Sequence, residues 1–160
     1  MVPMTPQNTK TRTRREMLAA AVGVGLAALV HLDPARATPA SMKAAIRNVV
    51  GEAPVKQGKV RIEVPPLVEN GNTVALAIEV ESPMTPANHV KAIHVFNELN
   101  PLPNVISAHF GPRAGRARIS TRFRLADTQT VVAIAELSDG TFWEAKADVV
   151  VTLQACLETL

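Results

Sequence analysis

The side chain best suited to covalent chemistry in this chain is the thiol of Cys156, the single cysteine among 160 residues. It lies in the closing stretch VVVTLQACLETL, and four residues follow it. Chain ends are usually the least ordered part of a domain. Two interpretations are therefore open: Cys156 is a small apolar residue that packs at the end of the chain, or it is a thiol on a tether that is presented to other proteins.

Histidine offers the other route to chemistry, and three of the four histidines follow the first 37 residues. They show neither the spacing of a metal site nor a pattern that would place a base beside Cys156. We therefore predict no catalytic residue, no metal ligand and no cofactor, and we interpret the histidines in apolar runs as hydrogen-bonded structural residues. A metal site that combines Cys156 with one histidine is a weaker alternative. The three histidines are His89, His94 and His109.

A stretch rich in glycine and arginine, HFGPRAGRAR, covers residues 109–118. It lacks the Gly-Lys-Ser/Thr ending of a phosphate-binding loop, so it does not indicate a nucleotide site. The stretch is typical of a tight turn between two strands with solvated arginines. The alternative is a basic edge that meets an acidic partner or an anion.

The first 37 residues have the features of an export signal. Arg14 and Arg15 precede a mildly apolar run over residues 17–30, and a small-residue site, Ala-Arg-Ala, ends the segment. Paired arginines before such a run are typical of twin-arginine export, so we predict cleavage after Ala37 and a location in the periplasm. An ordinary secretory signal is the alternative. A membrane anchor is disfavoured because a membrane-spanning helix needs about 20 apolar residues.

Removal of this segment changes the charge of the chain. The segment holds five of the 17 lysines and arginines and two of the 14 acidic residues, so the mature chain carries 12 of each and has no net charge. The excess of basic residues thus belongs to the export signal, and we exclude nucleic acid as a partner. Exported domains usually pair their cysteines. An unpaired thiol such as Cys156 therefore indicates a reactive group or an intermolecular bond.

Hydrophobic periodicity predicts one helix and a series of strands after the signal. Residues 41–51, SMKAAIRNVVG, place apolar side chains at helical spacing, with Ser41 as the cap and Gly51 beyond the end. From residue 60 onward the apolar residues alternate instead, as in half-buried strands. Asn70-Gly71 between the first two runs predicts a hairpin turn. The predicted strands cover residues 60–64, 74–80, 90–99, 105–110, 117–125, 130–137 and 142–153.

About seven short strands, separated by clusters of Pro, Gly, Asn and Asp, are typical of an all-β, immunoglobulin-like antiparallel β-sandwich. We expect this domain to span residues 38–153, with the short helix at its start and a C-terminal arm of residues 154–160 after it. In the last strand Val151 and Leu153 share the apolar parity, and Cys156 falls on the opposite, polar parity. An extended arm would therefore point the sulfur away from the sandwich.

Two stretches of the chain resemble one known family. HVKAIHVFNELNPLPNV and HFGPRAGRARISTRFRLADTQTVVAIAELSDGTFW are similar to the SoxY family, the sulfur-carrier subunit of the bacterial thiosulfate-oxidising system. The resemblance implies an immunoglobulin-like sandwich that is not an enzyme and that pairs with a similar subunit, SoxZ. It also implies that Cys156 holds sulfur intermediates covalently and carries them between periplasmic sulfur-oxidising enzymes, with no cofactor of its own.

The C-terminal arm departs from the usual pattern of that family. Members typically end in Gly-Gly-Cys-Gly-Gly, whereas this chain ends in QACLETL, which is closer to SoxY-related paralogues whose arm reads approximately Ala-Ala-Cys-Ile-Glu. Glycines let a backbone thread a narrow cleft without side-chain clashes, and Leu157 and Glu158 do not. We expect an enzyme cleft shaped for a glycine arm to reject this one.

The sequence thus predicts a periplasmic sulfur-compound carrier that uses Cys156 and pairs with a SoxZ-like subunit. We expect this pairing to use a face or an edge of the sandwich, because residues 92–99, AIHVFNEL, have apolar side chains on both parities. The alternative is an interaction module that stabilises a periplasmic complex, in which Cys156 is structural. Neither interpretation includes a stable membrane association after the signal is removed.

Overall fold

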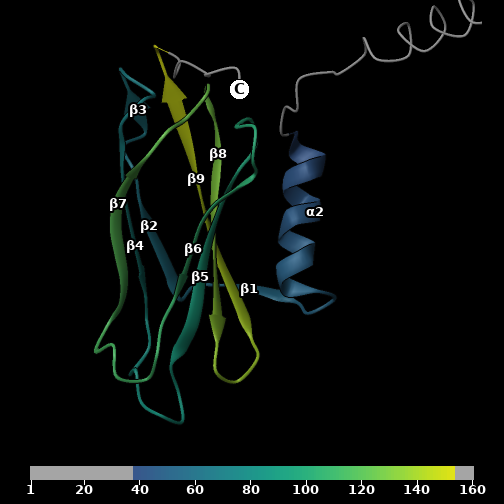
Figure 1. The fold of residues 1–160 in the computed structure, drawn as a ribbon, viewed down its shortest axis with the longest axis vertical. Helices are drawn as coiled ribbons and strands as arrows, with labels where there is room; N and C mark the ends of the chain where they lie inside the picture. Colours follow the sequence, from purple (N-terminus) through teal and green to yellow (C-terminus); the bar gives the residue numbers. More distant parts are fainter. Residues whose placement is uncertain (1–37, 154–160) are drawn as a thin grey trace, which may run out of the picture. The chain divides into compact units, whose positions relative to one another are not determined.

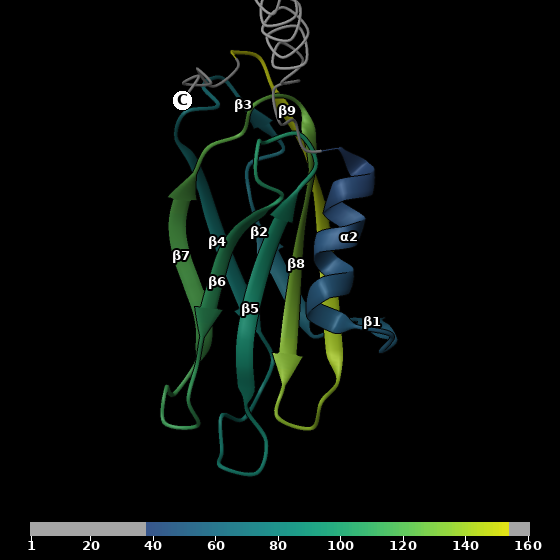
Figure 2. The same ribbon diagram turned by 45° about the vertical axis from the view of Figure 1, so that its right-hand side comes forward.

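A computed structural model of the chain describes residues 38–153 (Figure 1). The predicted export signal, residues 1–37, and the predicted arm with Cys156, residues 154–160, lie outside the described residues. Two β-sheets pack face to face, and one helix lies against the outer face of the larger sheet (Figures 1 and 2). In chain order the elements are α2 (Pro39–Val50), β1 (Val55–Gln57), β2 (Val60–Glu63), β3 (Leu67–Val68), β4 (Val74–Val80), β5 (Val90–Asn97), β6 (Asn104–His109), β7 (Ala117–Phe123), β8 (Gln129–Leu137) and β9 (Phe142–Val151).

The strands are arranged in a sheet of six and a sheet of three. The larger sheet has the order β1-β9-β8-β5-β6, and β3 also pairs with β9. The smaller sheet has the order β2-β4-β7. The pairs are antiparallel except that β1 and β3 run parallel to β9, one near each end of it. The predicted antiparallel sandwich with one short helix is therefore confirmed for the described part of the chain.

The longer strands begin and end within two residues of their predicted bounds, because alternating apolar residues mark them clearly. Two further strands, β1 with three residues and β3 with two, are too short to show any period. Residues 38–153 thus form nine strands rather than about seven.

The predicted hairpin turn at Asn70-Gly71 is wrong. β2 and β4 do pair with each other, but the chain between them leaves the smaller sheet and forms β3 on the larger one. Pro65 and Pro66 have no backbone N–H and therefore cannot extend the ladder of β2. The carbonyl of Pro66 instead accepts a hydrogen bond of 2.9 Å from the backbone N–H of Val150.

Helix α2 begins three residues earlier than predicted because Thr38, and not Ser41, is its cap. The backbone N–H of Ser41 donates to Oγ1 of Thr38 at 3.2 Å, and the backbone N–H of Thr38 donates to Oγ of Ser41 at 2.7 Å. These two bonds form a capping box. The helix ends before Gly51 as predicted, and the positive φ of 62° there suits glycine. No helix in residues 38–153 is long and apolar enough to cross a membrane.

We expect Thr38→Ala to lower the free energy of unfolding by about 1 kcal/mol, because it removes the side-chain acceptor from the first turn of α2. Thr38→Ser keeps a hydroxyl acceptor and should stay close to the wild type. Urea unfolding followed by circular dichroism measures both variants. Equal losses in the two variants would contradict the role of the cap.

The main hydrophobic core lies between the two sheets. Ile78 of β4 and Val95 of β5 are completely buried there. On β9, Val149 and Val151 belong to the same core, and Trp143 packs against it. The predicted apolar parity of the last strand is therefore confirmed as far as Val151, whereas Leu153, predicted to share it, lies beyond β9 and is exposed.

A second, smaller core lies between α2 and the larger sheet. Met42 of the helix packs with Phe96 of β5 and Ile134 of β8, as the helical spacing predicts. β5 thus uses both of its apolar faces inside the subunit, because Ile93 belongs to the main core and Phe96 to the core under the helix. The apolar side chains on both parities of residues 92–99 are used inside the subunit, since β5 lies between β8 and β6 and both of its faces are covered. This strand therefore gives no reason to expect a partner, and pairing through a face or an edge of the sandwich stays a prediction.

Candidate functional site

The last residues that the structure describes, Thr152 and Leu153, are held by the segment that follows β2. The backbone N–H of Thr152 donates to the carbonyl of Val68 at 3.0 Å, and that of Leu153 donates to the carbonyl of Glu69 at 3.1 Å. The backbone N–H of Gly71 donates in return to the carbonyl of Leu153 at 2.9 Å. The chain is therefore fixed for two residues beyond β9, and we call residues 152–153 the arm base.

The surroundings of the arm base are also joined by hydrogen bonds. The backbone N–H of Leu125 donates to the carbonyl of Gly71 at 2.9 Å, which connects the end of β7 to the segment that holds the arm base. The backbone N–H of Val151 donates to Oγ1 of Thr128 at 3.0 Å, which connects β9 to the loop before β8. The arm base is thus part of a network that includes both sheets.

Two side-chain amides extend this network to the loop after β5. Nε2 of Gln129 donates to Oδ1 of Asn100 at 3.1 Å, and Oε1 of Gln129 accepts from the backbone N–H of Leu99 at 2.9 Å. Asn100 also donates to the carbonyl of Arg124 at 2.8 Å and accepts from the backbone N–H of Ala126 at 3.0 Å. The loops at this end of the sandwich therefore hold one another in place.

Four large apolar side chains are exposed in the described part of the chain. Leu67 and Val150 are partners in the pairing of β3 with β9 and are 60% and 48% exposed. Leu153 in the arm base is 67% exposed, and Leu102 in the loop after β5 is 75% exposed. All four belong to segments toward the end of the sandwich at which β5 and β9 end (Figure 1). We call these four residues the apolar collar.

Cys156 follows the arm base directly, although its own position lies outside the described residues. Three residues of fully extended chain span at most about 11 Å. Cys156 is the third residue after Leu153, the last residue that the structure describes, and its role at this end of the chain stays a prediction.

The segment that holds the arm base carries no clear signal in the sequence. Residues 66–71 act through their backbone N–H and carbonyl groups, which every residue carries, so their side chains give no signal. The one usable signal is the Pro65-Pro66 pair, which marks where the chain must leave the β2 ladder.

His94 and His109 lie on β5 and β6, within the larger sheet. Their rings meet edge to face with centroids 6.1 Å apart, and Nδ1 of His94 is hydrogen-bonded to Oγ of Ser107 at 2.9 Å. Burial and the neighbouring His109 lower the pKa of His94, and Glu136 opposes them in part. The prediction of a hydrogen-bonded structural histidine is confirmed for His94.

Residues 38–153 contain no group of three or more His, Cys, Asp and Glu side chains placed to hold a metal ion. Nδ1 of the third histidine, His89, lies 3.2 Å from the carbonyl oxygen of Thr85, within hydrogen-bond distance. The alternative that combines Cys156 with a histidine involves a residue outside the described part of the chain and stays a prediction for metal analysis.

We expect the stability of the fold to decrease as the pH falls below 6.5, the ordinary pKa of histidine, because burial and the neighbouring His109 lower the pKa of His94 in the folded chain. Below that pH the unfolded chain binds a proton at this side chain, whereas the folded chain, in which the pKa of His94 is lowered, resists it. His94→Gln cannot titrate and should lose this part of the decline, while His89→Gln should retain it. Urea unfolding at about pH 5 and about pH 7.5 measures the difference. An unchanged decline in His94→Gln would contradict the prediction.

Comparison with known proteins relates this arrangement to one family. A family model described as "Sulfur oxidation protein SoxY" matches residues 46–156, a range that ends at Cys156. The solved structure of the sulfur carrier protein SoxY from Chlorobium limicola f thiosulfatophilum is similar to this chain, with 26% identity and a TM-score of 0.60. The match covers 72% of this chain and 100% of that one. It confirms the predicted immunoglobulin-like class of the sandwich.

Structures of other proteins share the fold. Superoxide reductase (neelaredoxin) from Ignicoccus hospitalis is 17% identical, with a TM-score of 0.53, over 72% of this chain and 94% of that one. At this identity the likeness concerns the fold alone. A search of curated proteins finds no match.

Proposed function

The chain belongs to the SoxY family of sulfur oxidation proteins, and from this premise we propose that it carries sulfur compounds covalently on Cys156 and presents them to partner enzymes. The observation that carries the proposal is the position of Cys156 at the end of the family match, three residues beyond an arm base that is fixed by hydrogen bonds. A carrier needs a rigid domain and a thiol that partner enzymes can reach. The hydrogen bonds of the arm base keep the chain rigid up to Leu153.

The chemistry requires only the thiol of this chain and a partner that reacts with it. When the thiolate of Cys156 attacks the S–S bond of a donor, a new S–S bond forms, the old bond breaks and the donor's leaving group keeps the electron pair. When the thiolate is instead joined to a sulfur-compound anion, the new S–S bond releases two electrons, which the partner enzyme must accept. The species held on Cys156 is then a persulfide or an S-sulfonate. Hand-over reverses the first of these steps: a nucleophile of the receiving enzyme attacks the S–S bond, and the Cys156 thiolate leaves with the electron pair.

We further infer that residues 1–37 direct export to the periplasm and are removed after Ala37. Members of the SoxY family are generally exported. The capping box of α2 supports this boundary, because the N-cap of the helix is Thr38, the residue after the inferred cleavage site. The mature chain carries no net charge, and its inferred partners are a SoxZ-like subunit and sulfur-oxidising enzymes.

Intact mass spectrometry of the protein purified from its native host tests the carrier function. We expect a fraction of the protein to carry sulfur atoms on Cys156 that a thiol reductant removes. A uniformly bare thiol that also resists alkylation would contradict the proposal and support the structural interpretation of Cys156. The same measurement checks the export inference, since the mature protein should lack residues 1–37.

A further inference from the structure

The two outer faces of the sandwich differ in what covers them. Helix α2 covers the outer face of the larger sheet. Over the outer face of the smaller sheet, formed by β2, β4 and β7, no helix or strand of residues 38–153 lies (Figures 1 and 2). On the central strand β4, Leu76 and Ile78 are buried, so Ala75, Ala77 and Glu79 point outward.

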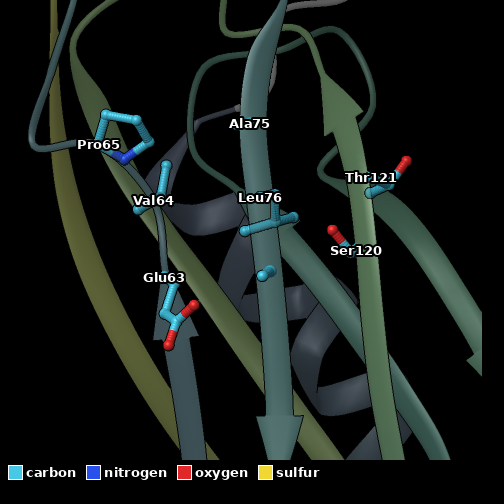
Figure 3. Close-up of a pocket in the computed structure, with 8 residues that line it drawn as sticks. Glu63, Val64, Pro65, Ala75, Leu76, Ser120 and Thr121 are labelled. Carbon is cyan, nitrogen blue, oxygen red and sulfur yellow. The ribbon is translucent and has the colours of Figure 1, made fainter.

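Ala75 and Ala77 form the floor of a shallow hollow of about 490 Å³ on this face. Glu63 and Pro65 border it on the β2 side, and Ser120 borders it on the β7 side (Figure 3). Alanine is depleted in strands, which favour larger β-branched and aromatic side chains. Two alanines in the middle of an uncovered sheet therefore leave room for a side chain that projects from another molecule.

Two arginines of β7, Arg118 and Arg122, lie two residues on either side of Ser120, on the same outward parity. Nη1 of Arg118 lies 3.3 Å from Oε2 of Glu79, its neighbour on β4. Arg122 lies opposite Ala75 and so meets no charge on the neighbouring strand. They belong to a run of arginines within residues 113–124 that contains no acidic residue, although the mature chain as a whole is neutral. The exposed arginines of this run are Arg113, Arg116, Arg118, Arg122 and Arg124.

We propose that this surface, which we call the alanine face and define by Ala75, Ala77, Ser120 and Arg122, binds a partner protein with an acidic contact surface. Carboxylates of the partner would face the arginines of β7, and a projecting side chain would fill the hollow. Arginine is enriched at protein interfaces, and its guanidinium group can donate two parallel hydrogen bonds to one carboxylate. Within the proposed function, on which this inference rests, the occupant is the SoxZ-like subunit.

The position of the alanine face supports this assignment. A subunit that stays bound to a carrier must leave the thiol free to enter other proteins. The alanine face lies on the side of the sandwich, whereas the arm base and the apolar collar lie at its end. A partner on this side would therefore leave the end of the sandwich open.

Ala77→Arg tests the inference by filling the hollow. The affinity for the purified SoxZ-like subunit, measured by calorimetry, should fall at least about tenfold. The matched control is Ala44→Arg, which introduces the same side chain at an exposed position of α2 and should leave the affinity within about twofold. Thermal unfolding of both variants checks that they remain folded. Equal effects of the two variants, or no binding by the wild type, would overturn the inference.

Arg122→Glu tests the acidic character of the partner. Binding should weaken, and the remaining affinity should depend less on salt, because one attractive charge pair becomes repulsive. Arg47→Glu on α2 is the matched control and should bind like the wild type. An affinity and salt dependence unchanged by Arg122→Glu would overturn the assignment of an acidic partner. The sulfur adduct on Cys156 is measured independently, so a failure of this inference is distinguishable from a failure of the carrier function.

Discussion

Replacing Cys156 with serine is expected to abolish covalent sulfur carriage completely while leaving the stability of the domain unchanged. The chain has one cysteine, and a serine hydroxyl cannot form an S–S bond. The carrier proposal keeps Cys156 out of the core, so urea unfolding should give the wild-type midpoint. Intact mass spectrometry of the variant from the native host should show no sulfur adduct on any molecule.

A cysteine placed elsewhere in the chain tests whether carriage needs the thiol at position 156 or only a thiol. Asn48 is exposed on α2, and Asn48→Cys added to Cys156→Ser restores one accessible thiol on the rigid body instead of the arm. This double variant should be alkylated readily and should still fail to exchange sulfur with the partner enzymes. Restored exchange would show that the arm is unnecessary, and a large loss of stability in Cys156→Ser would support the structural interpretation.

Phe96→Ala is expected to lower the free energy of unfolding by about 3 to 5 kcal/mol, which is a large fraction of the stability of an ordinary domain. Phe96 is completely buried and packs with Met42 of α2 and with Val132 and Ile134 of β8. Its removal leaves a cavity under the helix that the rigid sheet cannot close. Urea unfolding followed by circular dichroism measures the loss.

Leu102→Ala provides the comparison for this prediction. Leu102 is 75% exposed in the loop after β5, so its truncation removes little buried surface and should change the free energy of unfolding by less than about 0.5 kcal/mol. If Phe96→Ala were no more destabilising than Leu102→Ala, the packing of α2 on the larger sheet would be contradicted.

Much of this fold can be predicted from the sequence because outer strands such as β4 alternate in burial over seven residues, and the central strands β5 and β8 are nearly continuous apolar runs. Strands of two and three residues carry no such pattern, so β1 and β3 were not predictable. The failure at Asn70-Gly71 has a related cause. A turn-forming dipeptide indicates a turn but not which strands lie on either side of it, and here β3 intervenes.

The candidate site, like the fold, could be predicted only in part from the sequence. The single cysteine is visible in the sequence, whereas the hydrogen bonds that fix Leu153 join segments about 80 residues apart through backbone atoms alone. Residues 92–99 are ambiguous for a different reason. A strand with two apolar faces must bury both of them. The sequence does not show whether the second face is buried by a partner or, as here, by helix α2 of the same subunit.

The fixed arm base has a kinetic consequence. In the proposed carrier, a partner enzyme docked at this end of the sandwich would meet the thiol at an effective concentration on the order of millimolar or more, because a short tether keeps the reacting group nearby. The sulfur transfer would then proceed as a unimolecular step within the complex, and its rate would not depend on how dilute the carrier is. Selection among several enzymes would therefore occur at docking, through surfaces such as the apolar collar, and less through the reactivity of the thiol itself.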